Sequence, residues 1–123
     1  MTENIEKSAL GQHLIIDYFK CACDALSDPK FIEDLIIITA KKMNATIIMS
    51  NFHHFSPLGV SGVLVIAESH ITIHTWPEHN YVALDIFFCG ELDIEAGLDY
   101  FQTAIQSSQE KRQSIPRGRH IDL

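Results

Sequence analysis

Two alternating stretches on either side of a short turn most constrain the fold of this chain. The first stretch, Glu68–Trp76, points its side chains to two sides in turn: Ile71 and Ile73 to one, and His70, Thr72 and His74 to the other. A period of two residues is that of a β-strand. Pro77–Asn80 supplies a turn, and Tyr81–Phe88 is the second strand of a predicted hairpin. A purely structural strand does not need two histidines on one face, so we expect functional chemistry here.

Four further strands are predicted around this hairpin. Gly11–Lys20 is dense in apolar and aromatic residues, and Thr46–Phe55 precedes a turn at Ser56–Gly59. Ser61–Ala67 is rich in β-branched residues, and its composition predicts burial on both faces. A short last segment, Ser114–Arg119, contains a proline and is expected at a sheet edge, where proline is tolerated.

Two helices are expected between these strands. The first begins at Ser27–Lys30, which supplies a capping side chain and a proline for the first turn, and it runs to about Met43. The second is capped by Asp93 and closes with the polar run 106–112. Its inner side carries apolar residues at helical spacing: Ile94, Leu98, Phe101 and Ile105. Residues 1–10 are expected to form a loose arm.

This order of elements predicts an α+β fold. We expect an antiparallel β-sheet with both helices packed on one face, which is a two-layer sandwich. At 123 residues the chain is predicted to be a single domain, 1–123, because no linker, repeat or low-complexity run divides it.

The charge balance argues against one class of partner. A formal charge of −7, with only nine lysines and arginines, does not suit a nucleic-acid-binding protein, which needs a basic face. An acidic domain suits a cationic ligand. No apolar run reaches the length of about 18 residues that a membrane-spanning helix needs. Three cysteines and a polar N-terminus, unlike a secretory signal, predict reduced thiols and a cytoplasmic location.

Several side chains in and near the hairpin could carry chemistry, but their types alone leave alternatives open. Ser69 lies outside any Gly-x-Ser-x-Gly motif, so an ordinary serine hydrolase is not indicated. His74 is a candidate base because imidazole titrates near neutral pH, and Cys89 is either a reactive thiol or a buried inert one. A zinc site is a weaker alternative, because the histidine spacing matches no usual structural zinc pattern. Its candidate ligands are His53, His54, His70, His74, Glu78, His79 and Cys89.

A larger set of residues matches a specific family. Glu-Ser-His-Ile-Thr-Ile-His-Thr-Trp-Pro-Glu at 68–78, followed by Ala-Leu-Asp-Ile-Phe-Phe-Cys-Gly at 83–90, closely resembles the small prokaryotic S-adenosylmethionine decarboxylases. The similarity extends to Gly11-x-His-Leu-x-x-Asp17, to 52–62 and to Ile115–Gly118, so it covers nearly the whole chain after residue 10. The length and the acidic balance agree with this family.

The resemblance implies a proenzyme that cuts its own backbone. In that family the serine hydroxyl, here that of Ser69, attacks the preceding carbonyl, here that of Glu68, and the resulting ester eliminates. Residues 1–68 would become the β chain, and residues 69–123 the α chain with a pyruvoyl group at its N-terminus. This pyruvoyl is the expected cofactor, and no metal is expected. Its carbonyl forms a Schiff base with the substrate amine and accepts the electrons of decarboxylation, as pyridoxal phosphate does in other enzymes.

Further roles carry over to matching positions. His74 is similar to the histidine that moves protons during processing, and Ser61 resembles the serine that assists it. Cys89 matches the cysteine proposed to return a proton to the substrate carbon after CO2 leaves. The expected substrate-binding residues are Phe55 and Trp76, which match aromatics around the adenine, and Glu78, which matches a carboxylate that holds the ribose hydroxyls.

The resemblance also implies S-adenosylmethionine as the substrate, a place in spermidine biosynthesis, and a homodimer of αβ units with sites built from both protomers. The chain departs from the family at Asn80, where glycine is common, and at Phe88, where threonine is frequent. Three alternatives stay open. They are a pyruvoyl-dependent decarboxylase of ornithine or arginine, an unprocessed ligand-binding relative, and a metal hydrolase. The presence of both aromatics and of Glu78 favours the nucleoside substrate.

Overall fold

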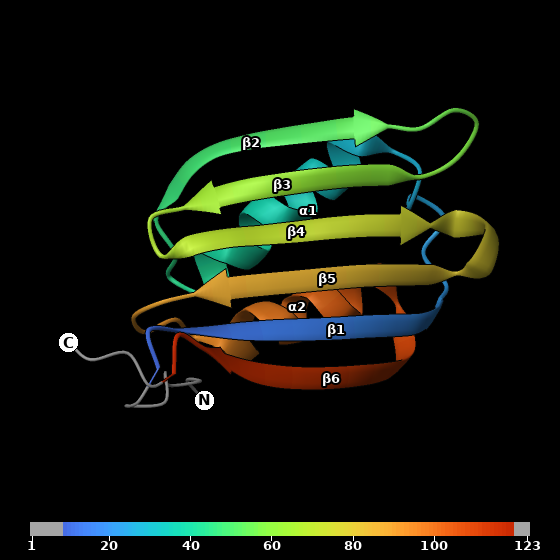
Figure 1. The fold of residues 1–123 in the computed structure, drawn as a ribbon. Coiled ribbons are helices and arrows are strands. Elements are labelled where there is room, and N and C mark those ends of the chain that lie inside the picture. Colours follow the sequence, from blue (N-terminus) through green and yellow to red (C-terminus); the bar gives the residue numbers. More distant parts are fainter. Residues whose placement is uncertain (1–8, 120–123) are drawn as a thin grey trace.

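The structure, a computed structural model, describes residues 9–119 and consists of one sheet with two helices on one of its faces (Figure 1). In this part of the chain the sheet has six strands in the order β2-β3-β4-β5-β1-β6, and every pairing is antiparallel. The elements are β1 (Gly11–Cys21), α1 (Pro29–Lys42), β2 (Ile47–His54), β3 (Val60–Ile66), β4 (Ser69–Trp76), η1 (Pro77–His79), β5 (Tyr81–Phe88), α2 (Ile94–Ile105) and β6 (Ser107–Arg117). The predicted two-layer α+β fold is confirmed.

The predicted N-terminal arm lies mostly outside the described residues. Its last residue, Leu10, donates its backbone N–H to the carbonyl of Arg117 at 2.9 Å, so the chain is already paired at the entry to β1. In the described part of the chain, neither helix has the length and hydropathy needed to cross a membrane.

Both helices begin at the predicted caps. The carboxylate of Asp28 accepts hydrogen bonds from the backbone N–H groups of Lys30 and Phe31, at 3.0 and 3.3 Å, and Pro29 occupies the first turn. Asp93 caps α2 in the same way. A capping side chain satisfies backbone donors that the first helical turn leaves unpaired and stabilises a helix by about 1 kcal/mol.

The core lies between the sheet and the helices. The alternation in the hairpin is confirmed, because Ile71 and Ile73 of β4 are fully buried on the helix-covered face while the histidines face the other side. Each such buried side chain stabilises the fold by about 1.5–3 kcal/mol. Other fully buried members of this core are Leu14, Ile16, Ile32, Ile36, Leu84, Ile86 and Phe101. The core therefore fixes which side chains β4 presents to the uncovered face.

The prediction that β3 is buried on both faces is wrong. Leu64 and Ile66 are buried, but Val63 and Val65 remain half-buried. Since they alternate with Leu64 and Ile66, they lie on the face of the sheet that neither helix covers (Figure 1), which we call the open face. The β-branched residues of β3 are therefore shared between the core and the open face.

The predicted polar close of the second helix, 106–112, is also wrong. Helix α2 ends at Ile105, Gln106 adopts a left-handed conformation with φ of 55°, and β6 begins at Ser107. This strand pairs with β1 from Ser107↔Cys21 to Arg117↔Gly11, so the predicted edge strand is real but much longer than expected. Backbone pairing at a sheet edge does not require apolar side chains, which explains why the polar composition was misleading.

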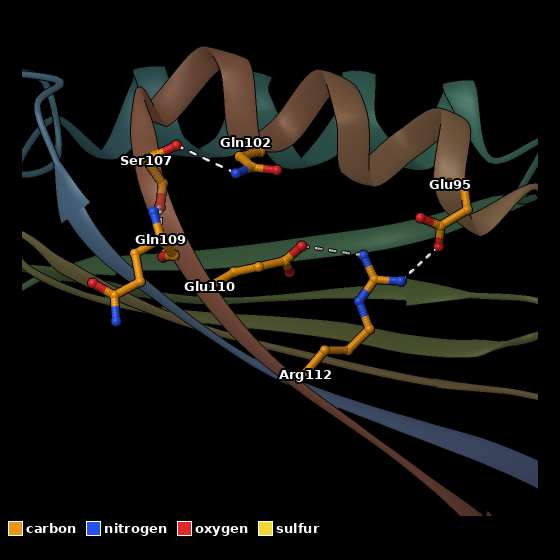
Figure 2. Close-up of polar contacts among 6 residues, drawn as sticks. All are labelled: Glu95, Gln102, Ser107, Gln109, Glu110 and Arg112. Atoms are coloured by element: carbon orange, nitrogen blue, oxygen red, sulfur yellow. Dashed lines mark hydrogen bonds and ion pairs between the residues drawn. The ribbon is translucent and has the colours of Figure 1, made fainter.

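Polar contacts join β6 to α2 (Figure 2). The Arg112 guanidinium lies between Glu95 of α2, with Nη1 2.6 Å from Oε2, and Glu110 of its own strand, with Nη2 3.5 Å from Oε1. Near the start of the strand, Gln102 Nε2 donates to the Ser107 carbonyl at 3.3 Å. These contacts hold the edge strand against the helix layer.

The close approach of the two helices at Gly97 gives a stability prediction. A Cβ at this position would lie 2.4 Å from Met43 Cγ and 2.9 Å from the Thr39 carbonyl. We expect Gly97→Ala to lower the free energy of unfolding by about 1–3 kcal/mol, because overpacking outweighs the gain in helix propensity. Denaturant unfolding measures this change. An increase in stability of about 1 kcal/mol, the intrinsic gain of alanine in a helix, would contradict the packing described here.

Candidate active site

The turn between β3 and β4 brings three predicted residues together. Ala67 and Glu68 form this turn at one end of the sheet (Figure 1), and Ser69 is the first residue of β4. The Glu68 carbonyl accepts the backbone N–H of Cys89 at 2.9 Å and the Cys89 thiol at 3.4 Å. We call Glu68, Ser69 and Cys89 the turn cluster. Its central feature is a backbone carbonyl polarised by a fixed donor.

Ser69 has a strained backbone. Its φ of 151° lies in a region that residues with a side chain rarely adopt. Strain of this kind costs on the order of 1–3 kcal/mol and persists only where neighbouring contacts enforce it. Cleavage of the bond that precedes Ser69 would release this strain.

A cavity of about 470 Å³ opens beside the turn cluster. Glu68, Ser69 and Cys89 all line it, together with Phe87 of β5 and Arg117 of β6. The Arg117 guanidinium lies 5.8 Å from the centre of the Phe87 ring, a cation–π contact. It gives a mostly apolar wall a positive charge that attracts a carboxylate. Sequence reasoning assigned no role to these two residues, although Arg117 falls within the matching segment Ile115–Gly118.

The other predicted residues form a second group, which we call the aromatic cluster. Ser61 Oγ and His74 Nδ1 are 2.7 Å apart, because the two residues are directly opposite in the β3–β4 register. Phe55, Trp76 and Glu78 line a cavity of about 250 Å³ with them. Phe55 and Trp76 are 48% and 40% exposed, so both are free to contact a ligand.

The two clusters lie at opposite ends of the sheet. Five residue steps separate Ser69 from His74 along β4, which at about 3.3 Å per residue is roughly 16 Å. Strand β4 cannot shorten this distance, since it is paired with β3 on one side and with β5 on the other. Within one chain, His74 therefore cannot exchange a proton with Ser69.

The histidines considered as metal ligands do not assemble. His53 packs edge-on against Phe55, with ring centres 4.6 Å apart, and His70 lies 5.8 Å from the Phe87 ring. Among residues 9–119, no group of three or more histidine, cysteine or acidic side chains is arranged to hold a metal ion.

Trp76 has a supporting stack that sequence reasoning missed. Its ring lies 5.3 Å from Tyr81, and Tyr81 stacks on Phe19 at 5.5 Å. The Tyr81 hydroxyl donates a hydrogen bond to the carboxylate of Asp17. A signal existed, because Trp76 and Tyr81 flank the hairpin turn and are therefore cross-strand partners. The departure at Asn80 also has a reason, since its φ of 50° is a conformation that asparagine tolerates.

The turn cluster defines a class of protein. A hydroxyl next to a carbonyl that a backbone N–H already polarises is an arrangement for acyl transfer. Here both groups belong to neighbouring residues of the same backbone. The fold and this site together are those of a two-layer α+β protein whose hairpin turn carries the groups that acyl transfer requires.

Comparisons with known proteins identify the family. A family model for S-adenosylmethionine decarboxylase matches residues 12–118. S-adenosylmethionine decarboxylase proenzymes of Thermodesulfovibrio yellowstonii and Acidithiobacillus ferrooxidans are 54% and 41% identical to the chain; each alignment covers 94% of it, and 89% and 86% of the respective relative. The crystal structure of the adenosylmethionine decarboxylase from Aquifex aeolicus matches with a TM-score of 0.85 at 32% identity, covering 94% of this chain and 97% of that one. The chain belongs to the S-adenosylmethionine decarboxylase family.

The Tyr81–Asp17 contact predicts a titration. Burial and the hydrogen bond to Asp17 raise the pKa of Tyr81 to about 12, because ionisation would put a phenolate in a partly desolvated position beside a carboxylate. The difference in ultraviolet absorbance between the wild-type protein and Tyr81→Phe should titrate near this pH. The same tyrosine absorbance, measured as the difference between Asp17→Asn and Asp17→Asn combined with Tyr81→Phe, should titrate at lower pH. An unchanged midpoint would show that Asp17 does not face the phenol.

Proposed function

We propose that this chain cuts its own backbone between Glu68 and Ser69 and that the processed protein decarboxylates S-adenosylmethionine. The observation that carries the first part is the Glu68 carbonyl, which is held by the Cys89 N–H next to a strained serine. Family membership supports the second part, because relatives covering most of this chain are named as proenzymes of this decarboxylase.

Self-cleavage follows from the chemistry of the turn cluster. Ser69 Oγ attacks the Glu68 carbonyl carbon and closes a small ring, and the Cys89 N–H stabilises the negative charge on oxygen. A donor in this position accelerates acyl transfer by about 10²–10³-fold. The carbon–nitrogen bond then breaks, the nitrogen takes up a proton, and an ester joins Glu68 to Ser69 Oγ.

Elimination completes the cut. A base removes the proton on Ser69 Cα, the bond between Ser69 Cβ and Oγ breaks, and Glu68 leaves as a carboxylate that keeps this oxygen and ends the 1–68 chain. The enamine that remains at residue 69 takes up water and releases ammonia, which leaves a pyruvoyl group at the start of the 69–123 chain.

The cavity beside the turn cluster suits the chemistry of this cofactor. The pyruvoyl carbonyl supplies the electron sink that decarboxylation needs and that no amino-acid side chain offers. Residue 69 and Cys89 line the same cavity, which supports a role for the Cys89 thiol in returning a proton to the substrate carbon. The wall is mostly apolar, and Arg117 attracts the substrate carboxylate before the reaction.

A second copy of the chain would supply the missing base. Since His74 lies roughly 16 Å from Ser69 in its own chain, we infer that the turn cluster of one protomer works with the aromatic cluster of its partner. The open face offers the surface for this contact, because it is apolar at Val63, Val65 and Phe87 and bears no helix. In such a homodimer the partner's Ser61–His74 pair would move the proton in elimination. The partner's Phe55, Trp76 and Glu78 would hold the adenosyl group.

The proposed setting is the cytoplasm. All three cysteines are free thiols, which agrees with a reducing compartment. The product would serve spermidine biosynthesis as the family resemblance implies.

Substrate choice is tested by CO2 release. We expect the processed protein to release CO2 from carboxyl-labelled S-adenosylmethionine and not from ornithine or arginine, because the exposed aromatics at 55 and 76 suit a purine and a sulfonium. Trp76→Ala should raise KM by about tenfold or more, since an aromatic contact with a desolvated cation contributes about 2 kcal/mol. Ser69→Ala should be inactive toward every substrate. Release from a basic amino acid alone would replace the proposed substrate while leaving self-cleavage intact.

Complementation tests the shared site. We expect Ser69→Ala and His74→Ala each to remain uncut when expressed alone. When the two are co-expressed, a mixed dimer combines an intact Ser69 from one chain with an intact His74 from the other. Random pairing in equal amounts should therefore cut about a quarter of all chains. No cleavage in verified mixed dimers would contradict a site built from two protomers.

A further inference from the structure

Thr46 binds the cleavage turn with every polar group it has. Its carbonyl accepts the N–H of Ala67 at 2.8 Å, its backbone N–H donates to Glu68 Oε1 at 3.0 Å, and its hydroxyl donates to Glu68 Oε2 at 3.3 Å. Thr46 directly precedes β2, so these bonds tie the turn to the neighbouring strand. Bonds to a carboxylate are stronger than those between neutral groups.

The turn is thereby held from two sides. The side chain of Glu68 is bound to Thr46, and its carbonyl is bound to Cys89 on the far side. Ser69, whose φ is strained, directly follows Glu68, which is held at both its side chain and its carbonyl. A strained conformation needs contacts that prevent it from relaxing, and these are the contacts that Glu68 makes.

We propose that Thr46 is a positioning residue for self-cleavage. It holds Glu68 so that the carbonyl stays against the Cys89 N–H and within reach of the Ser69 hydroxyl. This role rests on the proposed function, because it requires that the chain be cut at this bond. Thr46 takes no part in the bond changes themselves and acts through the Glu68 side chain.

The same contact outlasts the cut. Thr46 and Glu68 both belong to residues 1–68, so cleavage breaks none of the three hydrogen bonds. The new chain end stays tied to the start of β2 at the cavity wall, while Ser69 is released on the other fragment. Thr46 therefore also keeps the side-chain carboxylate of Glu68 from moving into the cavity that the substrate needs.

A pair of substitutions isolates the hydroxyl of Thr46. Thr46→Val removes it with little change of shape, and Thr46→Ser keeps it. Thr46 is exposed, so neither variant disturbs the core. Thr103→Val makes the same chemical change at an exposed position on α2 and serves as the control.

The rate of self-cleavage is measured on freshly translated chains by gel mobility. We expect Thr46→Val to be cut about three- to tenfold more slowly than the wild type, which is the effect of losing one exposed hydrogen bond of about 1 kcal/mol. Thr46→Ser and Thr103→Val should be cut at the wild-type rate. In a Glu68→Ala background, Thr46→Val should cause no further slowing, because the carboxylate that the hydroxyl binds is already absent.

Hydroxylamine identifies the affected step, because it cleaves esters much faster than amides. If Thr46→Val slows formation of the ester, chains that hydroxylamine can cleave should not accumulate. Accumulation of such chains would mean that elimination is slowed instead, and wild-type cleavage of Thr46→Val would mean that the contact has no role. Either result overturns the proposal for Thr46. A wild-type chain that is never cut would instead overturn the proposed function.

Discussion

The pairing of β4 on both sides is the constraint on which the site depends. Because β3 and β5 both pair with this strand from Ser69 to His74, Ser69 is fixed at one end of the sheet and His74 near the other. The buried isoleucines between them set the alternation that turns both histidines to the open face. A rigid central strand thus separates the two halves of the chemistry. This separation is the physical reason for expecting a second copy, since a strand of fixed rise cannot bring its own two ends together.

The turn that precedes β4 is held by hydrogen bonds next to a residue with a strained backbone, Ser69. The fold holds the Glu68 carbonyl with a backbone donor from the end of β5 and the Glu68 side chain with the start of β2. These contacts come from segments far apart in the sequence, and together they enforce an unfavourable conformation on Ser69. Part of the folding energy is thereby stored at one peptide bond. Tertiary contacts around a turn, rather than an added cofactor, would make a serine in this place reactive.

Much of the fold could be predicted because local patterns agreed with it. The alternation of side chains with a period of two residues predicts the hairpin, and the capping residues predict where both helices begin. The full length of the strand at 107–117 could not be predicted, since its polar residues follow a helix directly. Its pairing with β1 joins segments nearly a hundred residues apart in the sequence. The composition of β3 predicts burial on both faces, but composition shows only how apolar a strand is and not which elements cover it. For the site, the residue types of the turn cluster were predicted from the family pattern. The roles of Thr46 and Tyr81 depend on contacts that no local motif records.

The most direct test of self-cleavage is an intact-mass spectrum of the purified protein under denaturing conditions. Self-cleavage with formation of a pyruvoyl group should give two chains, 1–68 and 69–123, whose summed mass exceeds that of the uncut chain by about 1 Da, because water is taken up and ammonia is released. Simple hydrolysis of the same bond would add about 18 Da and leave serine at the new N-terminus. Either that larger sum or a single chain that stays uncut on incubation would contradict the formation of a pyruvoyl group and, with it, the decarboxylase mechanism.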